Sequence, residues 1–178
     1  AGLGRLGDLA ESLTTADFSD LDIEQLVVEA ADIAFLPTTS IPEPAAISEA
    51  MGDAYFEILS FIDEQGLAEA GAPLSITRAF SGSELLFDAA IPVRGLTADT
   101  PRDGPQVRIG TTYAGNVIRV RHVGSYRSLG TTHAKVAAYL AALGIERAGA
   151  AWESYVSDPT QVAEAELVTY VYYPISST

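Results

Sequence analysis

The sequence contains no cysteine, and only one lysine, one methionine, one tryptophan and two histidines among 178 residues. Without cysteine the chain forms no disulfide, holds no metal through thiolates and has no cysteine nucleophile. It also lacks the histidine spacings and the Asp-rich loops that bind zinc or calcium, so we expect no metal and no cofactor. The opening letters AGLGRLG lack the preceding strand and the Lys-Ser/Thr pair of a phosphate-binding loop.

Positive charge is also scarce, because nine Arg and one Lys stand against 24 acidic residues and leave a net charge of −14. Proteins that bind nucleic acid need clustered basic residues, whereas these are scattered, so we expect no direct nucleic-acid binding. An acidic surface attracts cations instead. The hydrophobic fraction of 48% fits a globular chain, but no segment is uniformly apolar enough to span a membrane.

The chain begins with Ala rather than Met. We therefore expect that residue 1 is not the start of translation, as in a processed chain, one that has lost a signal peptide, or a fragment of a longer protein. Within residues 1–24, a short helix followed by a linker is predicted by four leucines at helical spacing, Leu3, Leu6, Leu9 and Leu13.

The chain contains an internal repeat. The letters GLAEAGAPL at residues 66–74 match GIERAGAAW at residues 144–152, at a shift of 78. The letters LLFDAAIPV at residues 85–93 match LVTYVYYPI at residues 167–175, at a shift of 82. Two matched blocks in the same order indicate a duplication, with a longer turn near Asp158 in the second copy.

Each copy is predicted to have the same order of elements, strand–helix–strand–strand. Strands are expected at residues 25–36, 74–80 and 85–93 in the first copy, and at residues 116–123, 150–156 and 167–175 in the second. Two helices are predicted by apolar residues at helical spacing: Ile47, Met51, Ala54, Tyr55, Ile58, Leu59 and Ile62, then Leu129, His133, Val136, Ala137, Leu140 and Leu143. Gly66 and Gly144 follow them at the positions of C-terminal caps.

These elements predict an α+β fold. Two modules, residues 25–94 and 107–176, are expected to pair edge to edge into one antiparallel sheet with two main helices. The turn-rich residues 95–106 link the two modules. Because the copies are related by a quasi-twofold arrangement, we expect a central cleft at their seam, where ligands commonly bind.

The letters WESY in the second copy place a carboxylate within a predicted strand. Strand alternation puts Trp152 on one face, which predicts packing against the helices, and Glu153 with Tyr155 on the other face. Glu153 is then either a solvated residue or a carboxylate at the bottom of a pocket. The first copy has Ser75 at the position of Glu153, so one carboxylate lies near the quasi-twofold axis. This disfavours a hydrolase with paired carboxylates.

Several short motifs occur in a fixed order along the chain. They are HVGSY at residues 122–126, WESY at 152–155, a DP turn, EAEL before the last strand, and a final YPI, with FDAAIPV in the first copy. In these motifs the chain resembles GyrI-like small-molecule-binding domains, which are related to the effector-binding domains of AraC-type and multidrug-responsive transcription regulators. The resemblance covers residues 25–176. It implies a bacterial protein, with a cytoplasmic location favoured, and an upstream domain in a longer protein.

The resemblance also implies a function. Family members bind lipophilic, often cationic or planar compounds, so it implies a ligand in an aromatic cleft that contacts Glu153, Tyr155, Trp152, Tyr170 and Tyr126. Two alternatives stay open. One is a hydrolase of reactive electrophiles, with Glu153 as general base and Tyr155 as proton donor. The other is a protein-interaction module of the gyrase-inhibitor type.

The remaining candidates are aromatic residues of the last strand and the two histidines. Tyr170 and Tyr172 are expected on one face of that strand and Tyr173 on the other. His122 and His133 are interpreted as hydrogen-bonded packing residues rather than ligands of a metal or substrate.

Overall fold

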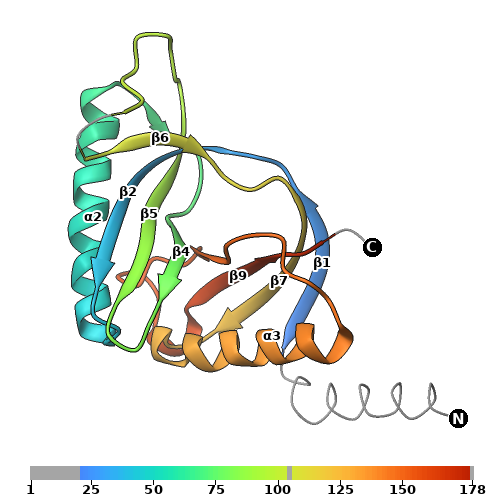
Figure 1. Ribbon diagram of the computed structural model, residues 1–178. Coiled ribbons are helices and arrows are strands. Elements are labelled where there is room, and N and C mark those ends of the chain that lie inside the picture. The colour runs from blue at the N-terminus through green and yellow to red at the C-terminus, as the bar shows by residue number, and fades with distance from the viewer. Residues whose placement is uncertain (1–20, 104–105, 177–178) are drawn as a thin grey trace, which may run out of the picture.

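The computed structural model describes residues 21–103 and 106–176 of the chain. The helix predicted within residues 3–13 lies outside these residues. The described part folds into one nine-stranded antiparallel sheet and two α-helices, α2 (Pro44–Glu64) and α3 (Leu129–Leu143), which lie on the outside of the bent sheet (Figure 1). This confirms the predicted α+β class. Neither helix is long and apolar enough to cross a membrane.

The order of the strands is symmetric about the centre of the sheet. It runs β1 (Asp22–Val28), β7 (Gly115–Val123), β9 (Val168–Pro174), β8 (Trp152–Tyr155), β4 (Leu74–Phe80), β5 (Leu85–Arg94), β2 (Asp32–Ser40) and β6 (Arg108–Thr111), and the short β3 (Ala68–Glu69) pairs with β5. Four pairs of strands are equivalent: β1 and β6, β2 and β7, β4 and β8, and β5 and β9. When the members of each pair are exchanged, the same order is obtained, read from the other end of the sheet. The sheet therefore has the symmetry that the predicted duplication requires, and its seam is the β4–β8 pair.

The register at this seam places the two copies about a quasi-twofold axis. Leu74 lies opposite Ser154, Ser75 opposite Glu153, and Ile76 opposite Trp152. The repeat shift of 78 residues converts the first pair into the third and returns the middle pair to itself. Ser75 and Glu153 therefore meet at the axis, as equivalent positions with different chemistry.

The single strand predicted at residues 25–36 is wrong, because the structure has two strands there. β1 pairs with β7 of the second copy, whereas β2 pairs with β5 and β6. Residues 29–31 carry the chain between the two halves of the sheet, where the Thr112 N–H donates to the Ala31 carbonyl at 2.9 Å. The apolar pattern is similar on both sides of this bend, so it does not mark where one strand ends.

Both helices end in the same way. Gly66 and Gly144 have a φ of 67°, a left-handed conformation that favours glycine. The N–H groups of Leu67 and Ile145, one residue further on, each donate to a carbonyl of the last helical turns at 2.9 Å. These glycine endings match the prediction and are a further sign of the duplication.

Each helix covers its own half of the sheet. α2 buries Ala54, Ile58 and Ile62 against β2 and β5, and α3 buries Leu129, Val136 and Leu140 against β7 and β9. Two residues predicted on the apolar stripes, Leu59 and Leu143, are instead 42% and 43% exposed. The buried stripe of each helix is therefore narrower than the apolar spacing predicts.

Trp152 lies on the face of the sheet that points away from the helices, so the prediction that it packs against them is wrong. Its ring is buried with residues such as Ile33 and Val117 and stacks on Tyr172, with ring centroids 4.7 Å apart. Alternation correctly separates Trp152 from Glu153, but it does not say which side the helices cover. Here both sides of β8 are covered, because the bent sheet has a second apolar core within its bend.

Candidate functional site

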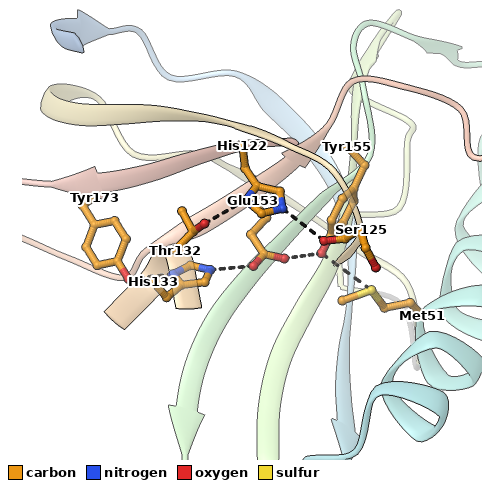
Figure 2. Close-up of polar contacts among 8 residues, drawn as sticks. All are labelled: Met51, His122, Ser125, Thr132, His133, Glu153, Tyr155 and Tyr173. Atoms are coloured by element: carbon orange, nitrogen blue, oxygen red, sulfur yellow. Dashed lines mark hydrogen bonds and ion pairs between the residues drawn. The ribbon is translucent and has the colours of Figure 1, made fainter. Parts of the chain in front are cut away.

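Glu153 lies on β8 at the seam, in the region where α2 and α3 both reach the sheet (Figure 2). Both oxygens of its carboxylate have partners. The Tyr155 hydroxyl donates to Oε1 at 2.5 Å, and Nε2 of His133 lies 2.6 Å from Oε2. The Glu153 side chain is 17% exposed, so this carboxylate is a partly buried and hydrogen-bonded group rather than a freely solvated one.

His133 connects Glu153 to the last strand. Its Nδ1 lies 2.6 Å from the hydroxyl oxygen of Tyr173 on β9 (Figure 2). When Nε2 carries the proton, the neutral imidazole donates to Glu153 and accepts from Tyr173. A hydrogen-bonded chain then runs from Tyr173 through His133 and Glu153 to Tyr155.

The other helix and a short 3-10 turn complete this group. The Tyr155 hydroxyl lies 3.7 Å from the sulfur of Met51 on α2, and the Tyr55 hydroxyl donates to the Leu74 carbonyl at 2.7 Å. Tyr126, in η1 (Tyr126–Ser128), packs edge-on against the Tyr155 ring with centroids 5.5 Å apart. We call Glu153 and its neighbours the Glu153 cluster: Met51, Tyr55, Tyr126, His133, Tyr155 and Tyr173.

The charge of Glu153 acts on the phenols around it. Burial raises the pKa of Tyr155 well above its usual range, and the negative charge of Glu153 adds to the rise. Burial and then Glu153 likewise raise the pKa of Tyr55. Both side chains are therefore neutral hydrogen-bond donors in any ordinary buffer.

The two remaining tyrosines of the cluster follow the same rule. Burial raises the pKa of Tyr126, with Asp158 and Glu153 adding to the rise. Burial also raises the pKa of Tyr173, where Arg147 opposes the rise and Glu153 adds to it. One carboxylate thus has four neutral phenols around it. The carboxylate gives the cluster a negative potential, and the tyrosine rings form its aromatic walls.

An alkaline titration tests this arrangement. We expect Glu153→Gln to lower the pKa of the buried tyrosines, because the substitution removes a charge that opposes phenolate formation. The measurement is tyrosinate absorbance near 295 nm as the pH rises. Because the phenols of the unfolded chain ionise first, near pH 10, the free energy of unfolding should also fall above that pH. Identical titration curves for wild type and variant would contradict the assigned role of Glu153.

The structure brings together three of the five residues predicted to contact a ligand, namely Glu153, Tyr155 and Tyr126. Trp152 and Tyr170 lie on the opposite face of the sheet. There the Arg119 guanidinium lies 4.5 Å from the centre of the Tyr170 ring. Tyr170 shares this face with Tyr172, as predicted from alternation.

Sequence reasoning missed the contact between His133 and Glu153, because His133 lies on the apolar stripe of α3. A signal was present, since the repeat shift of 78 relates His133 to Tyr55 and so directs both side chains toward the seam. His122 has the surroundings expected of a hydrogen-bonded packing residue. It is buried, its Nδ1 lies 2.8 Å from the Thr132 hydroxyl, and its Nε2 lies 3.1 Å from the Ser125 carbonyl.

A hollow of about 240 Å³ lies near the start of α3, outside the Glu153 cluster. It is lined by Leu21, Val120, Arg121, His122, Val123, Ser128, Thr131, Thr132 and Lys135. A cleft centred on Glu153 therefore stays a prediction. The cluster reaches solvent at Tyr126, which is 37% exposed, and at His133 and Glu153, whose side chains are 26% and 17% exposed. Within residues 21–103 and 106–176, no three His, Asp or Glu side chains gather as they would around a metal ion.

The fold and the cluster together define a class of protein: a duplicated α+β domain with one carboxylate between two helices at its seam. The chain belongs to the GyrI-like family, the GyrI-like small molecule binding domain, whose model matches residues 46–176. No curated protein matches the chain.

Several solved structures share this fold, and three of them are EcmrR, SAV2435 and a hydrolase from Listeria innocua. EcmrR in its complex with DNA superposes with a TM-score of 0.78 at 11% identity, over 99% of this chain and 69% of EcmrR. SAV2435 bound to tetraphenylphosphonium gives 0.60 at 8% identity, over 88% of this chain and 94% of SAV2435. A hydrolase from Listeria innocua gives 0.58 at 14% identity, over 92% of this chain and 98% of that protein. Identities this low show the fold alone.

Proposed function

We propose that the chain binds lipophilic cations at the Glu153 cluster, with the carboxylate as the counter-charge and the tyrosines as walls. The observation that carries this proposal is the arrangement of four neutral phenols around one partly buried carboxylate. A cation that enters such a group gains Coulomb energy in a medium of lower dielectric constant than water. It also gains attraction from the faces of the aromatic rings.

The charge of the whole chain favours the same class of ligand. A net charge of −14 raises the local concentration of cations and repels anions. The bound tetraphenylphosphonium in SAV2435 is a lipophilic cation of this kind, in a protein of the same fold. Both points support a ligand with a positive charge and a large apolar surface.

The two alternatives fit the geometry less well. A hydrolase would need Glu153 to hold a water against an electrophile, as the similarity to the Listeria innocua hydrolase invites. Each oxygen of Glu153 already has a short contact, with Tyr155 or with His133, so a water would have to share the oxygen with one of these groups. A protein-interaction module would use the acidic surface of the chain and gives the buried phenols around Glu153 no role.

Two ions of nearly the same shape and size test the proposal, tetraphenylphosphonium and tetraphenylborate, because they differ in the sign of their charge. We expect the wild-type chain to bind the cation at least tenfold more tightly at pH 7.5, measured by calorimetry or by quenching of tyrosine fluorescence. A tenfold difference corresponds to about 1.4 kcal/mol. Equal affinities, or no binding of the cation, would contradict the proposal.

A further inference from the structure

We infer that His133 competes with the ligand for Glu153, so that the site takes a cation only after His133 has lost its own positive charge. This inference rests on the proposed function. It adds His133 as a residue that decides whether the site binds a cationic or a neutral ligand. The geometry points to it directly, because Nε2 of His133 lies 2.6 Å from Oε2 of Glu153, within the distance of a charged hydrogen bond.

The pair has two charge states with opposite consequences. A neutral imidazole donates to Glu153 and leaves the pair with one negative charge, which attracts a cation. A protonated imidazole cancels that charge and adds a positive group beside the place where a cationic ligand would lie. The protonated pair therefore disfavours cations, while a neutral ligand of similar shape experiences little difference.

The partly exposed position of His133 allows the exchange. Its side chain is 26% exposed, so protons and solvent reach the ring from outside the cluster. His133 has a second partner, the Tyr173 hydroxyl, which accepts from Nδ1–H in the charged ring and donates to Nδ1 in the neutral one. Both protonation states are thus accommodated without a change in the fold.

Groups on the other elements around His133 stay in one charge state between pH 5.5 and 7.5. Raised pKa values keep the phenols of Tyr173 on β9 and of Tyr155 on β8 neutral throughout. Across the cluster the phenols of Tyr126 on η1 and Tyr55 on α2 are neutral for the same reason.

The charged group in direct contact with His133 is Glu153 on β8. A second charged group, Arg147, lies beyond Tyr173, the other partner of His133, with its guanidinium carbon 4.8 Å from the centre of the Tyr173 ring. The same two groups are present when His133 is replaced, so a comparison with that variant isolates the histidine.

Histidine is the side chain that ordinarily titrates in this range, near pH 6.5. The chain has only two, and His122 is buried at the start of α3 with partners on both ring nitrogens. A pH dependence of cation binding between pH 5.5 and 7.5 can therefore be assigned by comparing the two histidines. The expected sign is tighter binding as the pH rises, since deprotonation frees the charge of Glu153.

The experiment measures the dissociation constant of tetraphenylphosphonium from pH 5.5 to 7.5 at constant salt, for wild type, His133→Gln and His122→Gln. Exclusive competition between one proton and the cation makes wild-type binding weaker at pH 5.5 than at 7.5, and we expect a difference of at least about threefold. We expect His133→Gln to vary by less than about twofold and to bind more tightly than wild type at pH 5.5. We expect His122→Gln to keep the wild-type profile.

Calorimetry in two buffers with different ionisation enthalpies provides a second measurement. Wild type should release protons when the cation binds near pH 6.5, and His133→Gln should release fewer, because binding and protonation are reciprocally linked. Cation binding with the same pH profile and proton release in wild type and His133→Gln would overturn this inference alone. An absence of cation binding in both proteins at every pH would overturn the proposed function and the inference with it.

Discussion

Glu153→Gln should weaken the binding of tetraphenylphosphonium by about 10- to 100-fold at pH 7.5, equivalent to about 1.4–2.8 kcal/mol. The reason is electrostatic, because the substitution removes the carboxylate charge from the centre of the cluster and retains its shape. Glutamine also keeps the local hydrogen bonds. Its amide oxygen accepts from Tyr155, and its amide nitrogen donates to His133 once the imidazole proton moves to Nδ1 and bonds Tyr173.

The matched control is Glu164→Gln, which removes one negative charge from an exposed position in η2 (Glu164–Glu166), away from β8. This control should lower the affinity for the cation by less than twofold, because an exposed charge is screened by salt. Tetraphenylborate should bind Glu153→Gln no less tightly than wild type. A cation affinity that is equal in wild type and Glu153→Gln would contradict the proposed role of the carboxylate.

The repeat allowed much of the fold to be predicted from the sequence. Matched blocks at a constant shift predict equivalent elements, and the order of strands in the sheet has the corresponding symmetry. The same shift places Ser75 and Glu153 at one axis, which the register confirms. The exchange of β1 and β6 between the two halves was not predictable, because strand patterns describe which residues alternate and not which strand lies beside them.

The site was predicted less completely, for a related physical reason. Strand alternation separates Glu153 from Trp152 but does not orient either face, and a carboxylate is ordinarily expected to face solvent. In this chain the second core within the bend buries Trp152, so the helices cover the side that carries Glu153. His133 was interpreted as packing because an apolar helical stripe does not show which of its members also carries a polar contact.

The orientation of Trp152 leads to a second large effect, on stability rather than on binding. Trp152→Ala should lower the free energy of unfolding by about 3–5 kcal/mol, because it leaves a cavity in a buried core and removes a ring stacked on Tyr172 at an interplanar angle of 6°.

Trp152→Phe is the matched variant, since it keeps an aromatic ring in that core and should cost about 1–2 kcal/mol. Because Trp152 faces away from Glu153, we expect the folded Trp152→Phe variant to bind tetraphenylphosphonium within twofold of wild type. Denaturant unfolding followed by circular dichroism measures the first effect, and calorimetry on the folded protein measures the second. A tenfold loss of cation affinity in a stable Trp152→Phe variant would instead place the ligand against Trp152 and Tyr170, on the face of the sheet opposite the helices. The two faces of β8 are therefore expected to have separable effects. Substitution of Glu153 should change the affinity for the cation, and substitution of Trp152 should change the free energy of unfolding.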